Sequence, residues 1–302
     1  MNLATASLRE FVTRPHTPQN NSWASVSQPN RVRPQYPKLT VVTPSYNQVQ
    51  YLERTILSVL NQQYPNLEYF IVDGGSTDGS VELIKKYEPY LAGWVSEKDR
   101  GQTDAINKGF RWATGDLVAF QNSDDVFSSG AFERVANVWR ENTDAGVFYG
   151  NMYMIDEQDV ITEEFRLPPF CAECHIYEGM QVYNQSLFVR RDLLQETGLL
   201  DESLRFVIDY ELVARLGVQP GVRFQHVNGF WGGFRVQPDA KSSTMATVGM
   251  AEHEQIRERF TPFLRSRLGK GFWLRYCRIR KLLYFVIRGQ WGYVRHRLSL
   301  RK

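Results

Sequence analysis

Cysteine and long apolar runs are both scarce in this chain. Its 302 residues contain three cysteines, too few for a disulfide framework, so we expect none and a reducing compartment. No apolar run reaches the length of about 18 residues that a membrane-spanning helix needs, and the first residues contain no apolar signal core. The sequence therefore predicts a globular cytoplasmic protein.

The glycine-rich phosphate loops of two large nucleotide-binding classes are also absent. The segment after the first expected strand reads PSYNQ at 44–48, without the GxGxxG fingerprint of dinucleotide-binding proteins. The P-loop spacing GxxxxGK[ST] does not occur either. A nucleotide site in this protein must therefore be built in another way.

Strand-like and helix-like segments alternate from residue 39 to residue 140. Apolar, β-branched runs at 39–43, 67–72, 94–96 and 117–120 are separated by helical segments at 49–60 and 103–114, and by a helix after Thr77 or Asp78 whose core-facing residues are Val81, Ile84 and Tyr87. A further helix is expected at 127–140, and a late strand at 222–227. The alternation predicts an α/β fold with a doubly wound, Rossmann-like, mostly parallel sheet flanked by helices.

The two ends of the chain differ from this central part. Residues 1–38 are rich in Ser, Thr, Pro, Asn and Gln, which predicts a disordered or loosely ordered leader. Residues 265–302 contain twelve Lys and Arg and no acid, leaving 24 basic against 33 acidic residues elsewhere. We expect a domain at 39–250 with halves at 39–127 and 128–250, then a basic amphipathic helical tail at 251–302. The tail suits an anionic membrane surface or packs on the acidic domain; no motif indicates nucleic acid.

Acidic side chains follow the expected strands at one edge of the sheet. They are Asp73, Asp99, Asp104, Asp124 and Asp125. The carboxyl ends of parallel strands share one edge, where open α/β sheets bind ligands. An acidic edge repels phosphate unless a divalent cation intervenes, and Mg²⁺ or Mn²⁺ prefers carboxylate oxygens. The pattern predicts a metal-bridged nucleotide.

Four segments in this order carry a resemblance to a known family. They are TVVTPSYNQ at 40–48, YFIVDGGSTDGSVELIKKY at 69–87, DRGQTDAINKGF at 99–110 and TGDLVAFQNSDD at 114–125. They resemble the nucleotide-sugar half of family 2 glycosyltransferases, which have the GT-A fold. NQSLFVRRDLL at 184–194 and LLDESLRFVIDYELVARL at 199–216 resemble the acceptor half.

The resemblance implies a metal-dependent, inverting glycosyltransferase in polysaccharide or glycolipid biosynthesis. Its donor would be a UDP-, GDP- or dTDP-sugar, its cofactor Mg²⁺ or Mn²⁺, and its acceptor a glycan or lipid-linked hydroxyl, reached from the cytoplasm or from the cytoplasmic face of a membrane. The alternative is a non-catalytic nucleotide-sugar or carbohydrate-binding protein on the same fold. A nucleotidyltransferase would need a basic, glycine-rich phosphate loop that is missing here.

The resemblance also assigns donor-site residues. Thr43, Pro44 and Tyr46 would border the nucleobase and ribose, and Asp73 would accept a hydrogen bond from the base. The remaining donor-binding residues that it implies are Arg100, Asp104, Asn122, Ser123, Asp125 and Arg235. Asp124 would be the main metal ligand with Asp125 beside it. Asn122 departs from the family's DxDD pattern, and an amide adds no charge there.

The catalytic base of such enzymes lies in a Glu-Asp pair that opens a helix. The matching segment is VIDYE at 207–211, in which Ile208 replaces the Glu. Asp209 is therefore the expected base and Glu211 the substitute. Gln237 stands where the family often has a histidine, with Ser242 following it as the family's serine does.

Two further features remain open from the sequence. The segment Cys171-Ala-Glu-Cys174-His175 has the CxxCH pattern of c-type haem attachment, but we interpret it as a plain acceptor-side loop, because neither a signal peptide nor a local fourth metal ligand accompanies it. Trp231 either lines the acceptor cleft or packs in the core.

Overall fold

The computed structural model describes residues 36–238, 246–264 and 268–299. Most of the expected leader and Ser242 therefore lie outside the described residues. Nine strands of the described chain form one sheet in the order β3-β2-β1-β4-β8-β6-β9-β5, with β7 paired to β6. The strands are β1 (Leu39–Ser45), β2 (Leu67–Asp73), β3 (Gly93–Ser96), β4 (Leu117–Phe120), β5 (Val126–Phe127), β6 (Ala145–Ile155), β7 (Ile161–Phe165), β8 (Leu187–Arg190) and β9 (Arg223–Arg235). The main helices are α1 (Val49–Leu60), α2 (Ser80–Tyr87), α3 (Gln102–Trp112), α4 (Ala131–Glu141), α5 (Ala172–Glu178), α6 (Arg191–Thr197), α7 (Ile208–Val218), α9 (Ala246–Phe260), α10 (Lys270–Ile287) and α11 (Trp291–Ser299).

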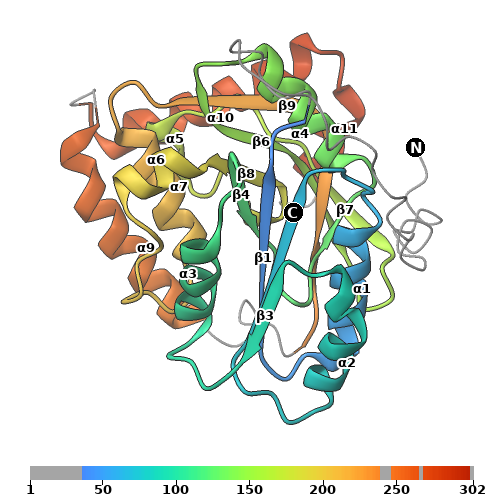
Figure 1. Ribbon diagram of the computed structural model, residues 1–302. Coiled ribbons are helices and arrows are strands. Elements are labelled where there is room, and N and C mark those ends of the chain that lie inside the picture. The colour runs from blue at the N-terminus through green and yellow to red at the C-terminus, as the bar shows by residue number, and fades with distance from the viewer. Residues whose placement is uncertain (1–35, 239–245, 265–267, 300–302) are drawn as a thin grey trace, which may run out of the picture.

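The first four strands are parallel, as the alternation of strands and helices predicts. β1 pairs with β2 on one side and β4 on the other, and β3 extends the sheet beyond β2. From β8 onward the sheet is mixed, because β8 runs antiparallel to both β4 and β6 while β6 and β9 are parallel. This is the expected α/β architecture with helices on both faces (Figure 1).

Two hydrophobic cores lie on opposite faces of the sheet because strand side chains alternate between faces. Val42 and Phe120 contribute to the core shared with α3, α7 and α9. Leu39 and Val41 contribute to the core shared with α1, α2 and α4. In Figure 1, α3 and α9 accordingly lie on one side of β1, and α1 and α2 on the other.

Two expected elements have wrong bounds. The helix predicted at 127–140 begins at Ala131, because Val126 and Phe127 pair with Gly233 and Gly232 as strand β5. The strand predicted at 222–227 continues to Arg235 as β9. Its extension buries Trp231 in the core, where the indole lies against Gly150 and Phe188. Trp231 is therefore a core residue and not part of the acceptor cleft.

The described part of the basic tail forms helices that pack on the acceptor half. α9 contacts α7, and α10 contacts α5 (Figure 1). A disulfide joins Cys174 of α5 to Cys277 of α10, with the two Cα atoms 5.5 Å apart. The expectation of no disulfide was therefore wrong: the bond links cysteines 103 residues apart. None of the described helices has both the length and the apolar character needed to cross a membrane.

Candidate active site

The parallel strands end at a common rim. Ser45 at the end of β1 is opposite Asp73 at the end of β2, and Asp73 is opposite Ser96 at the end of β3. β4 ends beside them, with Phe120 opposite Val42. The loop Asn122-Ser123-Asp124-Asp125, which we call the acidic loop, therefore starts at the rim that the other strands share.

The two carboxylates of the acidic loop face different surroundings. Asp125 is buried, and its carboxylate accepts hydrogen bonds from the Asn122 amide at 2.9 Å, the Gln185 amide at 2.7 Å and the Arg235 backbone N–H at 2.8 Å. Burial and the neighbouring Asp124 charge raise the pKa of Asp125, while its donors act in the opposite direction. Asp124 is only half-buried and accepts from the Gln237 amide at 3.0 Å. Asp124 is therefore the more accessible carboxylate of this loop, and Asp125 fixes the loop.

Neighbouring side chains hold the backbone of the acidic loop. The Thr55 hydroxyl of α1 contacts the carbonyl oxygens of Ser123 at 2.9 Å and Asp125 at 2.7 Å. The side-chain oxygen Oδ1 of Asn122 accepts from the Gln102 amide at 2.6 Å. Because both ends of the Asn122 amide are engaged by protein, this residue organises the loop in the structure.

Arg235 is buried beneath the acidic loop. Its Nε donates to the Asp124 carbonyl at 2.7 Å and its Nη1 to the Asp156 carbonyl at 2.8 Å. Its Nη2 forms an ion pair with Asp159 at 2.6 Å, and both side chains are 0% exposed. The guanidinium thus ties the acidic loop to the turn between β6 and β7. The expected contact between Arg235 and the donor stays a prediction.

Asp73 likewise uses its carboxylate within the protein. It accepts from the backbone N–H groups of Gly75 at 3.1 Å and Ser76 at 2.8 Å, and from the hydroxyls of Ser76 and Ser96 at 2.5 and 2.7 Å. These bonds shape the loop after β2 and join it to β3. Asp73 is 0% exposed, so a base-contacting role requires this loop to rearrange.

The three expected nucleoside residues lie at the end of β1 but differ in exposure. Thr43 is buried, and its hydroxyl shares a hydrogen bond of 3.0 Å with Tyr69 in the core. Pro44 is also buried in the strand, whereas Tyr46 is 62% exposed. Tyr46 is therefore the side chain of this group that is open to a ligand.

Arg100 and Asp104 pair with each other at the start of α3. Arg100 Nη2 lies 2.8 Å from Asp104 and 2.7 Å from Glu202. The Arg100 hydrogen bond lowers the pKa of Asp104. The pair connects the nucleotide half to the loop that precedes α7, which carries the expected base.

Asp209 lies in the first turn of α7 and is half-buried. Burial raises the pKa of its carboxyl to about 6, although the backbone N–H groups of Tyr210 and Asn184 lower it. A carboxylate with that pKa is ionised at neutral pH and is a stronger proton acceptor than an ordinary aspartate. These are the properties that a general base requires.

A one-turn 3-10 helix, η4 (Asn184–Ser186), connects the acidic loop with Asp209. The Asn184 N–H stabilises the Asp209 carboxylate, and the adjacent Gln185 side chain binds the Asp125 carboxylate. A Cβ at Gly232 would lie 2.0 Å from the Gln185 carbonyl oxygen, so glycine is needed for β9 to pass this turn. Consecutive residues of η4 therefore act on Asp209 and on the acidic loop.

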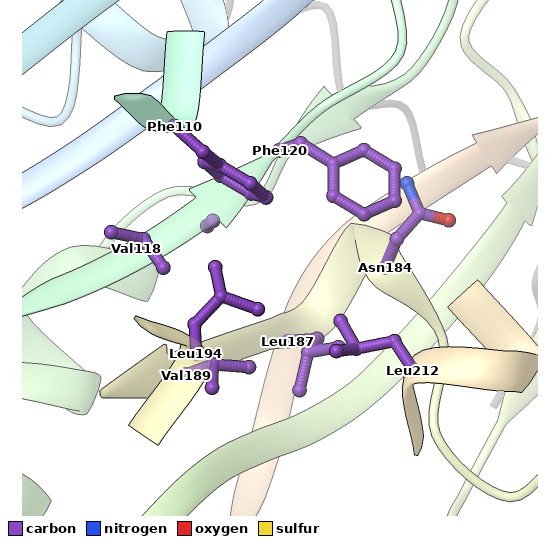
Figure 2. Close-up of a pocket in the computed structure, with 9 residues that line it drawn as sticks. Phe110, Val118, Phe120, Asn184, Leu187, Val189, Leu194 and Leu212 are labelled. Atoms are coloured by element: carbon purple, nitrogen blue, oxygen red, sulfur yellow. The ribbon is translucent and has the colours of Figure 1, made fainter. Parts of the chain in front are cut away.

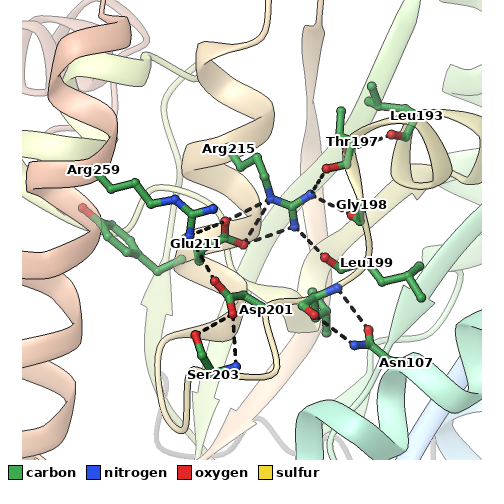
Figure 3. A network of polar contacts seen from close by, with 12 residues as sticks. Asn107, Leu193, Thr197, Gly198, Leu199, Asp201, Ser203, Glu211, Arg215 and Arg259 are labelled. Atoms are coloured by element: carbon green, nitrogen blue, oxygen red, sulfur yellow. Dashed lines mark hydrogen bonds and ion pairs between the residues drawn. The ribbon is translucent and has the colours of Figure 1, made fainter.

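Glu211, the substitute base, has a structural position. It is buried and forms an ion pair with Arg215 at 3.0 Å. Figure 3 shows the Arg215 guanidinium also donating to the carbonyls of Thr197, Gly198 and Leu199. Glu211 thus orients Arg215, whose hydrogen bonds stabilise the segment 197–199 before α7. The expectation that it could act as the base is contradicted by this burial and pairing.

Three residues that our sequence analysis did not assign support the site. Gln185 holds Asp125, as described above. Glu252 of α9 accepts the backbone N–H groups of Arg205, Phe206 and Val207 at 2.8 to 3.1 Å, just before Asp209. The Asn107 amide forms two hydrogen bonds with the Leu200 backbone, seen in Figure 3. Gln185 and Asn107 lie in segments that carry the family resemblance, NQSLFVRRDLL and DRGQTDAINKGF, so the sequence could have indicated them. Nothing in the sequence around Glu252 indicates that this residue binds the backbone before α7.

No cluster of three or more His, Cys, Asp or Glu side chains within the described ranges could hold a metal by itself. The donor set at the rim still fits a hard cation, because Mg²⁺ sites commonly combine one or two carboxylates with substrate phosphate oxygens. Asp124 would supply the carboxylate. The Gln237 amide, which donates to Asp124, could supply a further oxygen ligand. Asp125 fits less well, since both of its oxygens accept hydrogen bonds from protein.

The CxxCH segment forms helix α5 and not the plain loop that we expected. Cys174 is bonded to Cys277, and His175 is buried against Tyr210, with ring centroids 4.4 Å apart. Its ring nitrogens lie 3.0 Å from the Tyr210 carbonyl and 3.3 Å from the Gln181 N–H. Burial lowers the pKa of His175 to about 3. The motif therefore serves packing and cross-linking.

A small cavity under β4 does not belong to the rim. Its volume is about 10 Å³, and it is lined by apolar side chains of β4, α3, β8, α6 and α7 together with Asn184 (Figure 2). This space is of the order of a single water molecule. A nucleotide sugar is therefore too large for this cavity.

Comparisons with known proteins agree with this architecture. The model of the family described as "Glycosyl transferase family 2" matches residues 40–196, more than half of the chain. The "Putative teichuronic acid biosynthesis glycosyltransferase TuaG" of Bacillus subtilis is 37% identical over 131 residues, which cover 41% of this chain and 49% of that protein. The chondroitin synthase of Escherichia coli is 27% identical over 197 residues, covering 64% of this chain and 28% of the other. The matches thus span about half or less of these relatives.

Solved structures share the fold. Residues 1–349 of TarS from S. aureus in complex with UDP-GlcNAc give a TM-score of 0.59 at 18% identity, covering 80% of this chain and 72% of the other. The mannosyltransferase PcManGT of Pyrobaculum calidifontis in complex with GDP-Man and Mn²⁺ gives 0.55 at 18% identity, with coverages of 90% and 79%. The GT-A fold expected from the sequence is confirmed by these likenesses. With its fold and the matched segment in agreement, the chain belongs to glycosyl transferase family 2.

Proposed function

We propose that this protein is an inverting, cation-dependent glycosyltransferase that moves a sugar from a nucleoside diphosphate sugar to a hydroxyl of a glycan or lipid-linked acceptor. The observation that carries the proposal is the position of η4 between the acidic loop and Asp209: the Asn184 N–H lowers the pKa of Asp209, and the Gln185 amide donates to Asp125. The acidic loop suits a cation bound to a nucleoside diphosphate, and Asp209 suits an acceptor hydroxyl.

Asp209 would act as the general base. Its carboxylate would accept the proton of the acceptor hydroxyl while that oxygen forms a bond to the anomeric carbon. The bond from that carbon to the diphosphate oxygen would break on the opposite face. The configuration at the anomeric carbon is therefore inverted, and the nucleoside diphosphate leaves with the electron pair. The raised pKa of Asp209 favours this proton transfer.

Asp124 would hold Mg²⁺ or Mn²⁺ together with donor phosphate oxygens. When bound, such a cation neutralises negative charge on the leaving diphosphate. Arg235, Thr55 and Gln185 would keep the acidic loop in shape through the contacts described above. Tyr46 at the end of β1 would face the nucleoside. These roles use groups that the fold already orients.

The proposed process is polysaccharide or glycolipid biosynthesis. Support comes from the names of the relatives, a teichuronic acid biosynthesis glycosyltransferase and a chondroitin synthase. Donors of the UDP-sugar and GDP-sugar type are supported by the ligands of TarS and PcManGT. The dTDP-sugars are retained as the third candidate class.

The tail is proposed to rest on the cytoplasmic face of an anionic membrane. Exposed apolar residues recur at helical spacing along α10, at Phe272, Tyr276, Ile279, Leu283 and Ile287. Several Arg and Lys side chains alternate with them, the arrangement of an interfacial helix. The Cys174–Cys277 disulfide favours an oxidising environment, which counts against the cytoplasmic side of that membrane.

The test is a donor screen with the purified chain. UDP-, GDP- and dTDP-sugars, each with Mn²⁺ or with a chelator, are compared by thermal shift, because a ligand that binds the folded state raises its apparent stability. We expect one nucleotide class to stabilise the protein in a Mn²⁺-dependent way, and Asp124→Asn to abolish the Mn²⁺ dependence. The matched control Asp192→Asn alters an exposed carboxylate of α6 that pairs with Arg190. Stabilisation that is equal with and without Mn²⁺ would contradict the cation's role.

A further inference from the structure

A cavity of about 310 Å³ lies between the tail helices and the acceptor half. One wall comes from α10 and α11, and the other comes from β7 with the segments that follow β7 and α5. The disulfide to Cys277 fixes α10 beside this wall. The volume lies at the lower end of the range of small-molecule sites.

The lining of the cavity is apolar with a cationic edge. Its apolar side chains include Leu167, Met180, Leu282 and Phe285. Its charged side chains are the cations Arg166, Arg278, Lys281 and Arg297 and the acid Glu178. Three of the four cations lie near acids: Arg166 pairs with Glu164, Lys281 lies 3.7 Å from Glu178, and Arg297 pairs with Glu163. No described acidic residue lies within ion-pair distance of Arg278 in this structure. The cavity therefore combines a space for hydrocarbon with a cation able to meet an anionic group.

The lining of the cavity includes both exposed apolar residues and a residue near the proposed base. Ile279, Leu282 and Leu298 line the cavity and are also 58, 44 and 56% exposed. Tyr183 lines it as well; burial raises the pKa of Tyr183 to about 12, with a further contribution from the Asp209 charge. Tyr183 directly precedes Asn184, whose N–H lowers the pKa of Asp209. The cavity is therefore lined both by the exposed apolar face of the tail and by the neighbour of a residue that acts on the proposed base.

We propose that this cavity binds the hydrocarbon segment next to the phosphate of a lipid-linked acceptor. The apolar walls would take the chain, Arg278 would face the phosphate, and the exposed apolar mouth would let the rest of the chain remain in the membrane. The acceptor hydroxyl would then extend past Tyr183 to Asp209. This inference rests on the proposed function and deepens it, because it selects a lipid-linked acceptor over a free glycan.

The test is calorimetric titration of the full chain with decyl phosphate below its micelle concentration. Inorganic phosphate and decyl maltoside are the comparison probes. We expect decyl phosphate to bind at one site per chain, at least about tenfold more tightly than either probe, because apolar contact and charge pairing both contribute. Equal binding of decyl maltoside, or equal binding of inorganic phosphate, would overturn the proposal.

Neighbouring residues on α10 provide matched variants. Leu282 lines the cavity, whereas Leu283 is 50% exposed and does not line it. Leu282→Glu should weaken decyl phosphate binding by about tenfold or more, since a carboxylate would lie in an apolar space and repel the phosphate. Leu283→Glu should leave that binding unchanged while it weakens attachment to anionic vesicles. Equal affinities in the two variants would overturn the assignment.

Arg278→Gln is a second, milder variant in case Leu282→Glu does not fold. It should weaken decyl phosphate binding by about tenfold and leave decyl maltoside binding unchanged. Unchanged decyl phosphate binding would overturn the role of Arg278. Donor binding is measured by thermal shift with Mn²⁺ on every variant. Retained donor binding with a negative decyl phosphate result refutes this inference alone, whereas wild-type protein that binds no nucleotide sugar refutes the proposed function.

Discussion

Replacing Arg235 with methionine removes the guanidinium beneath the acidic loop. In the structure this group pairs with Asp159 at 2.6 Å, with both side chains 0% exposed, and donates to the carbonyls of Asp124 and Asp156. Breaking one side of a buried ion pair costs about 3 to 5 kcal/mol, because the partner charge stays buried. Arg54 remains 3.1 Å from Asp159, so we expect a loss near the lower end, about 3 kcal/mol.

Urea unfolding measures this loss. With a slope of about 3 kcal/mol per M, a loss of 3 kcal/mol lowers the midpoint by about 1 M. The control is Arg223→Met on the same strand, since Arg223 pairs with Asp144 on the surface, where the two side chains are 46 and 63% exposed. An exposed pair contributes at most about 1 kcal/mol.

A second variant separates a structural role from a donor-binding role. Adding Asp159→Asn to Arg235→Met removes the buried charge, so the double variant should be more stable than Arg235→Met alone. A midpoint for Arg235→Met that equals the wild-type value, combined with weaker donor binding, would refute this reasoning and favour direct contact between Arg235 and the donor.

Three further predictions concern the base, the disulfide and the support of α7. Turnover should fall as pH decreases through about 6, because Asp209 with its raised pKa becomes protonated there and can no longer accept a proton; a profile that stays flat from pH 7 to 5 would argue against Asp209. Non-reducing peptide mapping should find Cys174 linked to Cys277 and Cys171 free, and Cys277→Ser should lower the free energy of unfolding by about 2 to 4 kcal/mol; free thiols at both positions would contradict the cross-link. Glu252→Ala should release the N–H groups of Arg205, Phe206 and Val207 and lower kcat at least about tenfold with donor binding unchanged, whereas unaltered kcat would show that Glu252 does not position Asp209.

Local patterns in the sequence were sufficient for the parallel half of the fold. Periodicity placed the segment at 49–60 as a helix, and α1 has these same bounds. The acidic loop was predicted because it lies where an expected strand ends, whereas Asp209 was predicted from the resemblance to family 2 glycosyltransferases and lies where α7 begins. Strand β5 was missed because two residues carry no periodicity; its pairing with β9 decides its conformation.

Long-range partners account for what the sequence did not predict. Glu211 differs from Asp209 by two positions, and only the location of Arg215 and the loop after α6 shows that it is buried in an ion pair. The disulfide joins residues 103 apart, so no local spacing indicates it. Asp125 and Asp124 are adjacent in the chain, yet the donors around Asp125 come from Gln185 and β9. Sequence spacing therefore finds candidate carboxylates, whereas the surrounding partners decide which of them are open to substrate.

The most direct test of the account compares turnover and donor binding in Asp209→Asn. An amide has nearly the same shape as the carboxylate but cannot accept the acceptor proton, and general-base catalysis contributes about 100- to 10,000-fold. We predict that kcat for donor consumption with acceptor falls by at least about 100-fold, while the thermal shift caused by the donor and Mn²⁺ stays at the wild-type value. Turnover within threefold of wild type would contradict the assignment of Asp209 as the base.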